Sequence, residues 1–264
     1  MKSKTALILL ICLNLVVCAS SQKKIDKAKE NDPEYQYNLG LFYLREGNIN
    51  EAIRYINKAL TLKPEYDNAL CTLGLAHSMK GEFQESIAYL KQSLDINPRL
   101  TEAHNYLGVA YQELGFIEEA EKEFRIAIFD PNYKSKELPY YNLARIYFSN
   151  DKLEDALQYV NMSLTLDKNF RLAHNMKGMI FEKQLNYAAA IESYKLALKN
   201  LRADPSAGSN LAVDYYVTIN FNLGVAYFKN DELQKAKEIF VKIYPRVTDV
   251  EMRIKIDQYL RVIK

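Results

Sequence analysis

The stretch Asn105–Ala127, NYLGVAYQELGFIEEAEKEFRIA, is the part of the chain that decides the fold. It reads as two amphipathic helices, with Gly108 inside the first helix and Gly115 at the turn between the two. Gly74 lies 34 residues before Gly108, and Gly40 lies another 34 residues before Gly74. Recurrence at a fixed period of this length indicates a repeat protein, in which each helix pair stacks on its neighbours.

Two columns of small residues recur with this period, one in each helix of a pair. Antiparallel helices approach closely only where their side chains are small, so we expect the helices of each pair to cross at these columns. Glycine takes a left-handed backbone at little steric cost, which predicts that the first helix ends at Gly47, Gly81 and Gly115. The first column is Gly40, Gly74, Gly108, Ala144, Gly178 and Gly224, and the second is Ala52, Ser86, Ala120, Ala156, Ala190 and Ala236.

These motifs resemble the tetratricopeptide repeat (TPR) family, which has aromatic residues, Leu, Gly, Tyr, Ala and Pro at set offsets. The resemblance implies an all-α fold, a TPR solenoid that forms a right-handed superhelix of about six helix-turn-helix repeats with a C-terminal capping helix. The fourth repeat has Ala144 in place of Gly, and the fifth has Lys177 where the family has Leu. The expected parts are a signal peptide over 1–18, a tether over 19–32, repeats over 33–66, 67–100, 101–134, 137–170, 171–204 and 217–250, and the capping helix over 251–264.

Two insertions interrupt the period. The joint Asn132–Pro139 is longer than a standard repeat junction, and extra residues that include Asp204–Asn210 separate the fifth and sixth repeats. The second segment has the Pro, Gly, Ser and Asn composition of a loop. Such loops in solenoids lie on one face, where they either contact a partner or simply remain solvated.

The N-terminus has the pattern of an export signal. A basic start precedes an apolar run, 6–17, that is too short to span a bilayer comfortably. Leu15–Cys18 resembles the bacterial lipobox, which implies acylation of Cys18 and a lipoprotein on the periplasmic face of the outer membrane. The residue before the lipobox cysteine is usually Gly, Ala or Ser, and here it is Val17. The alternative is cleavage after Ala19, which releases a soluble periplasmic or secreted protein.

The sequence offers little chemistry for catalysis. We find no nucleophile elbow, P-loop or dinucleotide fingerprint, and we expect no enzyme activity, no metal and no cofactor. The formal net charge is +2 and the charges are interspersed, which argues against nucleic acid as a partner. Cys12 leaves with the expected signal peptide, so Cys71 is the one free thiol left if Cys18 is acylated. Because Cys71 lies on an expected helix, we interpret it as a small hydrophobic residue instead of a reactive thiol.

The concave side of the solenoid is the surface on which the resemblance places partner binding. Particular positions of each first helix line it, and most of them are apolar or aromatic in this chain. An apolar strand or an amphipathic helix is therefore the expected ligand, although part of the row could instead pack against neighbouring helices. The candidate groove residues are Tyr37, Leu41, Leu44, Cys71, Leu75, Met79, Asn105, Val109, Gln112, Tyr141, Arg145, Phe148, Asn175, Met179, Glu182, Phe221, Val225 and Phe228.

An exported and acylated TPR solenoid resembles the type IV pilus biogenesis/stability lipoproteins, or pilotins. The motifs that carry this resemblance are Leu15–Cys18, the Tyr-Asn-Leu-Gly type segments such as Tyr37–Gly40, and the joint Asn132–Pro139. The resemblance implies a non-catalytic, membrane-anchored scaffold that assists assembly or localisation of an outer-membrane complex such as the pilus secretin, whose subunit is the expected protein partner. A lipidated adaptor of periplasmic peptidoglycan hydrolases and a soluble secreted TPR binding module are the alternatives.

Overall fold

The computed structural model describes residues 29–199 and 210–263, with the side chains of 210–214 excepted. The expected signal peptide, the acylation site Cys18, most of the tether and the loop 204–209 lie outside the described residues. Within the described residues the secondary structure is helical and contains no strand, as predicted for an all-α TPR solenoid. None of the helices in these ranges is both long enough and apolar enough to cross a membrane.

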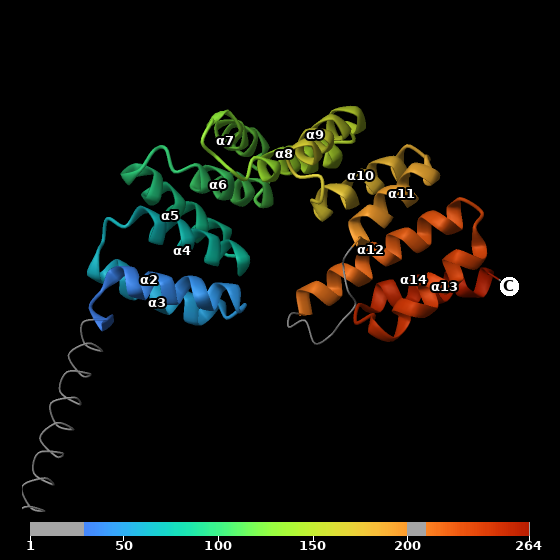
Figure 1. Cartoon of the computed structure of the whole chain (residues 1–264), viewed down its shortest axis with the longest axis horizontal. Helices are drawn as coiled ribbons and strands as arrows, with labels where there is room; N and C mark the ends of the chain where they lie inside the picture. The colour runs from blue at the N-terminus through green and yellow to red at the C-terminus, as the bar shows by residue number, and fades with distance from the viewer. Residues whose placement is uncertain (1–28, 200–209, 264) are drawn as a thin grey trace, which may run out of the picture. The chain divides into compact units, whose positions relative to one another are not determined.

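The described chain divides into two compact units, one before and one after the bond between Gly115 and Phe116. Figure 1 labels their helices in chain order. The described helices of the first unit are α2 (Pro33–Arg45), α3 (Ile49–Leu62), α4 (Asp67–Met79), α5 (Phe83–Ile96) and α6 (Thr101–Glu113). The described helices of the second unit are α7 (Ile117–Phe129), α8 (Glu137–Ser149), α9 (Leu153–Leu166), α10 (Arg171–Lys183), α11 (Tyr187–Leu198), α12 (Asn210–Lys229), α13 (Leu233–Ile243), the 3-10 turn η2 (Tyr244–Arg246) and α14 (Val250–Val262).

Close helix crossings occur where the sequence places its small residues. A Cβ atom added to Gly40 would lie 2.6 Å from a side-chain carbon of Ile56 in the neighbouring helix, and one on Gly178 would lie 2.5 Å from the ring of Tyr194. Carbon atoms in contact are ordinarily about 3.5–4.0 Å apart, so glycine is needed for these helices to come together. The large partners are fully buried, which makes each crossing the centre of its helix pair.

The fourth repeat solves the same packing problem with different residues. Ala144 replaces the glycine of the first column, and it lies in one buried cluster with Val160. Val160 stands at the position that Ile56, Leu90 and Tyr194 occupy in other repeats, and it is smaller than each of them. The extra methyl group on one helix is thus matched by a smaller side chain on the other.

Each first helix ends in a left-handed residue. Gly47, Gly81 and Gly115 have φ of 75°, 79° and 82°, which confirms the predicted turns. The same position in the later repeats is held by non-glycine residues, for example Leu185 with φ of 60°. The turn at Leu185 is fixed by a hydrogen bond of 2.8 Å from the N–H of Asn186 to the carbonyl of Phe181, as in a Schellman motif.

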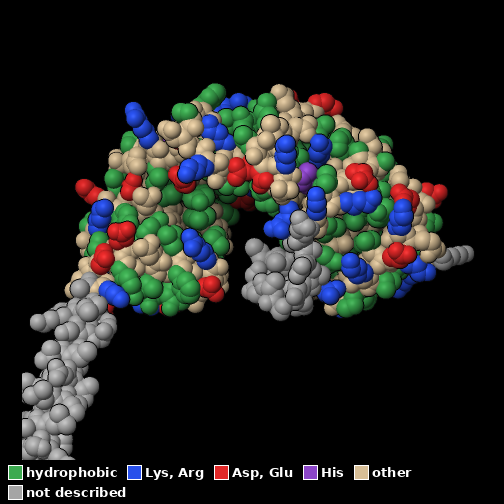
Figure 2. Space-filling model, viewed as in Figure 1, with side chains coloured by type: hydrophobic (Ala, Val, Ile, Leu, Met, Phe, Trp, Pro, Cys, Tyr) green, Lys and Arg blue, Asp and Glu red, His purple; other side chains and the backbone are tan. Residues whose placement is uncertain are grey.

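The last helix, α14, packs its buried side on the preceding helices of the second unit. Ile256 is fully buried there, and the ring of Tyr259 lies 4.9 Å from that of Phe228 and 5.2 Å from that of Phe240. On the surface, Figure 2 shows basic and acidic side chains interspersed over the visible face of the described residues.

Candidate functional site

A hollow in the second unit brings together residues of alternate helices, and we call it the α10 hollow. It has a volume of about 250 Å³ and lies between the first helices of successive pairs, α8, α10 and α12, with a side chain of α11 behind them. Its lining residues are Phe148, Met179, Glu182, Lys183, Tyr194, Asn222 and Lys229. The small Gly178 on α10 lets α11 approach closely, which is what brings Tyr194 to the back of the hollow.

Glu182 connects three helices at the α10 hollow. Its carboxylate accepts a hydrogen bond of 3.0 Å from the hydroxyl of Tyr194 on α11 and another of 2.8 Å from Nζ of Lys229 on α12. Burial, together with the adjacent carboxylate, raises the pKa of Tyr194 well above its ordinary value, so the phenol remains a donor. Partial burial is the largest single influence on the pKa of Lys229 and acts to lower it, but the hydrogen bond to Glu182 and the nearby negative charges together raise the pKa above its ordinary value.

The second lysine of the hollow is held at its edge. Nζ of Lys183 lies 2.7 Å from Oδ1 of Asp151, and 4.8 Å from the ring centroid of Phe148. Both contacts are partly exposed, so each contributes little to stability, but together they hold the ammonium group beside the aromatic ring. Both lysines of the hollow thus have carboxylate partners within the described residues, and the surface left for a ligand is mainly Phe148 and Met179.

Polar contacts position the floor of the hollow. The amide of Asn175 donates to the sulfur of Met179 at 3.7 Å, and the amide of Asn222 approaches the side-chain oxygen of Asn175 at 3.5 Å. A thioether held among partly buried polar groups is a flexible apolar contact that can adapt to different side chains. The arrangement suits non-covalent binding of an apolar group.

Of the predicted groove residues in the second unit, three line the hollow together: Phe148, Met179 and Glu182. Tyr141 instead packs its ring on Phe170 at 5.4 Å, and Phe221 lies 6.2 Å from Phe240. The remaining members take several positions. Val225 is buried, Phe228 packs on Tyr259 of α14, and Arg145 and Asn175 are half-buried.

The predicted groove residues of the first unit are less accessible than expected. Cys71 and Asn105 are 4% and 3% exposed, so they offer almost no surface to a ligand. Burial raises the pKa of the Cys71 thiol to about 12, in keeping with a packing role. Tyr37 bonds to the hydroxyl of Thr72 at 3.2 Å. Met79 is exposed, and the others are half-buried: Leu41, Leu44, Leu75, Val109 and Gln112.

Sequence reasoning missed four residues of the α10 hollow: Lys183, Tyr194, Asn222 and Lys229. Three of them lie one position after a predicted groove residue, namely Glu182, Phe221 and Phe228. Lys183 and Lys229 occupy the same column of the fifth and sixth repeats, so a lysine recurring at that column was the available signal.

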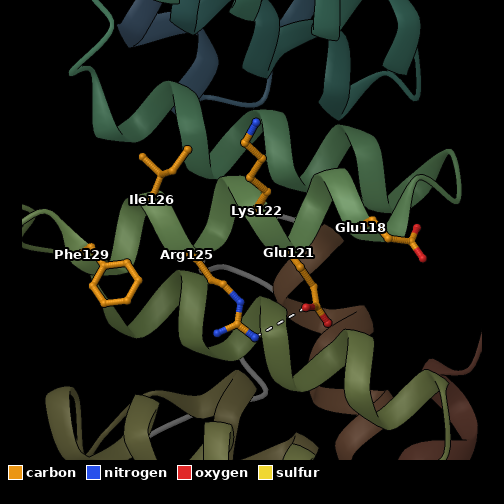
Figure 3. A pocket seen from close by; sticks show the side chains of 6 residues that line it. All are labelled: Glu118, Glu121, Lys122, Arg125, Ile126 and Phe129. Carbon is orange, nitrogen blue, oxygen red and sulfur yellow. Dashed lines mark ion pairs between the residues drawn. The ribbon is translucent and has the colours of Figure 1, made fainter.

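A second and larger hollow, of about 470 Å³, lies against α7 (Figure 3). Its described lining residues all come from that helix: Glu118, Glu121, Lys122, Arg125, Ile126 and Phe129. Arg125 pairs with Glu121 at 3.5 Å, and its guanidinium also lies 3.4 Å from the hydroxyls of Tyr147 and Tyr159. Phe129 is exposed and lies on a helix that contributes nothing to the α10 hollow, so it offers a control position for experiments on that hollow.

Comparison with known families assigns the repeats. Models described as "Tetratricopeptide repeat" match residues 33–99, 71–134, 141–208 and 217–244. The chain therefore belongs to the tetratricopeptide repeat family, whose stacked helix pairs generally act as scaffolds that hold protein partners. Among the described residues no group of three or more His, Cys, Asp or Glu side chains is arranged to hold a metal ion.

Solved structures share this fold at low sequence identity. PilF of Pseudomonas aeruginosa aligns with a TM-score of 0.69 and 19% identity, covering 88% of this chain and 99% of that chain. PilW, described as a widely conserved type IV pilus biogenesis factor, gives 0.71 and 16%, covering 85% of this chain and 97% of that chain. The Cut9–Hcn1 hetero-tetramer of the APC/C gives 0.73 and 18%, covering 91% of this chain and 44% of that one.

One curated relative matches part of the sequence. Tetratricopeptide repeat protein 21A of Homo sapiens is 35% identical over 74 residues, which are 28% of this chain and 6% of that protein. The match thus spans a small fraction of the relative.

Proposed function

We propose that this protein is a non-catalytic, membrane-anchored scaffold that assists the assembly or localisation of an outer-membrane complex, with the type IV pilus secretin as the foremost candidate. The observation that carries the binding part of the proposal is the α10 hollow, where Phe148 and Met179 face a space that the charged side chains leave open. The similarity in fold to PilF and PilW, over nearly their whole lengths, supports the choice of complex.

The proposed ligand is an apolar segment of an assembling subunit, either a strand or one face of an amphipathic helix. Its apolar side chain contacts Phe148 and Met179, while Lys183 and Lys229 lie beside it with their carboxylate partners. A hollow of this size accommodates one or two side chains, so the contact alone is weak. Acylation of Cys18 is the second part of the proposal, because tethering to the membrane raises the local concentration and lets a weak contact act.

The first experiment asks whether the complex depends on the protein. The gene is deleted, and secretin multimers in the outer membrane are measured with and without the full-length chain restored. The proposal predicts that multimers fall in the deletion strain and return on complementation. Undiminished multimers would rule out the secretin role, and capture of cell-wall hydrolases without secretin would favour the adaptor alternative.

The second experiment places the activity in the α10 hollow. The deletion strain receives one of two hollow variants: the double variant Phe148→Ser with Met179→Ser, or the single surface variant Lys183→Glu. The matched control is Phe129→Ser on α7. Thermal unfolding of each purified variant separates loss of binding from loss of folding. The proposal predicts fewer multimers with both hollow variants and normal amounts with the control; equal complementation by folded hollow variants contradicts it.

A further inference from the structure

The outward side of α14 carries apolar residues that nothing in the described part of the chain covers. Val250 is 70% exposed, Ile254 is 51% exposed and Val262 is 66% exposed. Exposed apolar side chains that gather on one face of a helix usually mark an interaction surface. The exposed valines and isoleucine of α14 therefore point to an additional partner.

Charged residues on the same side restrict the kind of partner. Glu251 lies near the start of α14 and Arg261 near its end, and both are exposed. Neither residue has an ion-pair partner within the part of the chain that the structure describes. Three other charges lie on α14. Asp257 accepts a hydrogen bond from the hydroxyl of Tyr244 at 3.2 Å, Arg253 lies over the ring of Tyr244 at 5.2 Å, and Lys255 is exposed next to position 256.

We propose that the partner is a second copy of this chain, bound through α14 in an antiparallel, two-fold symmetric pair. Position 256 lies midway between Glu251 and Arg261, and it also lies midway between Ile254 and Gln258. An antiparallel copy related by an axis beside position 256 therefore sets Glu251 level with Arg261 of the other copy at both ends of the pair. Between these two charge pairs, Ile254 of each copy lies level with Gln258 of the other. Residues of the two helices thus meet in successive layers, as in an antiparallel coiled coil.

The buried side of α14 agrees with this register. Ile256, Tyr259 and Ile263 face the body of the second unit, which leaves Val250, Ile254 and Val262 directed away from it. An anionic membrane would attract Lys255 and Arg261 but repel Glu251, whereas a second copy offers a charge of opposite sign to both Glu251 and Arg261. A second copy satisfies both Glu251 and Arg261 at once, which is the complementarity that an isologous interface requires.

The size of the helix sets the strength of the pair. A helix of 13 residues spans about 20 Å, so the contact lies at the small end of specific interfaces. We expect a reversible dimer with a dissociation constant of about 10–100 µM. Removal of the favourable charge pairing at both symmetry-related ends is expected to weaken it by about tenfold or more.

Charge reversal tests the pairing directly. Association of the full chain is measured by sedimentation equilibrium for the wild type, Glu251→Arg, Arg261→Glu and the double reversal, with Ile254→Glu as an apolar test. The matched control reverses Glu192 and Lys195, an exposed ion pair on α11. We expect both single reversals and Ile254→Glu to weaken the dimer, the double reversal to restore it, and the control to leave it unchanged.

Three results would overturn the proposal. The first is a wild-type chain that remains monomeric at about 1 mM, far above the expected dissociation constant. The second is a dimer that single reversals on α14 do not weaken, since it would form through another surface. The third is a double reversal that stays monomeric although its thermal unfolding matches that of the wild type.

Discussion

Gly178→Ala tests the close helix crossing that places Tyr194 behind the α10 hollow. The new Cβ atom would lie 2.5 Å from Cε1 of Tyr194, about 1 Å short of an ordinary carbon–carbon contact. The ring cannot move easily, because it is fully buried and its hydroxyl is bonded to Glu182. Overpacking of this kind costs about 1–3 kcal/mol, and the better helix propensity of alanine offsets about 1 kcal/mol of that.

The difference between these two effects is a net loss of about 0–2 kcal/mol. Because the ring is confined, we expect Gly178→Ala to lower the free energy of unfolding by the upper half of that range, about 1–2 kcal/mol. Urea denaturation followed by circular dichroism measures the change. Ala88→Gly, at an exposed position in the interior of α5, is the control that reports the difference between alanine and glycine within a helix.

A double-mutant cycle makes the test of this crossing decisive. The fourth repeat pairs Ala144 with the smaller Val160, so Tyr194→Val should remove the clash that an alanine at position 178 creates. In that background we expect Gly178→Ala to raise the free energy of unfolding by about 1 kcal/mol, a reversal of sign. A Gly178→Ala variant as stable as the wild type, or an unchanged effect in the Tyr194→Val background, would refute the reasoning.

Three further predictions concern turns, hydrogen bonds and pH. Leu185→Gly should raise the free energy of unfolding by about 0.5–1 kcal/mol, because relief of the left-handed strain exceeds the entropy cost of glycine; a lower melting temperature would contradict this. Ser163→Ala removes a buried hydrogen bond of 2.8 Å to the carbonyl of Glu137 and should cost about 1 kcal/mol in urea denaturation, and no loss would show that the bond contributes nothing net. Hydrogen bonds from Lys80 and then His77 lower the pKa of Glu82, so its stabilising effect is present above the unfolded pKa and is lost as pH falls through the lower folded value. The difference in stability between wild type and Glu82→Gln should thus be largest above about pH 5 and vanish in stronger acid, and a difference that grows on acidification would have the wrong sign.

The repeat period was sufficient to predict the helix crossings and the glycine turns, because each depends on local geometry that recurs every repeat. It could not predict that Asp151, Leu185 and Asp231 adopt positive φ at the same turn. The backbone of these residues is locally strained. The strained conformation persists because the two helices that flank the turn and the backbone hydrogen bonds within it fix the backbone there.

The candidate site was predicted only in part, for a reason of geometry. Phe148, Met179 and Glu182 belong to columns that recur at the inner side of the first helices, and they do line the α10 hollow. Lys183 and Lys229 each lie one residue after a predicted groove residue, namely Glu182 and Phe228. A shift of one residue turns a side chain by about 100° around the helix axis. Which of two such neighbours faces the hollow depends on how each helix is rotated against the next one.

Contacts between distant parts of the chain were beyond the reach of the repeat pattern. Phe228 was expected to line the groove, but its ring packs on Tyr259 of α14. That contact depends on where the last helix docks, and α14 is not a copy of any repeated element. The same docking leaves Val250, Ile254 and Val262 exposed, which only the structure reveals.

Site-specific photo-crosslinking in living cells tests most directly the claim that the α10 hollow holds a partner protein. A photo-reactive phenylalanine analogue replaces Met179 in one strain and the exposed Phe129 of α7 in another, and adducts are identified by mass spectrometry. The account predicts an adduct with a secretin subunit from position 179 and none from position 129. Adducts of equal yield from both positions, or a secretin adduct from position 129 alone, would contradict it.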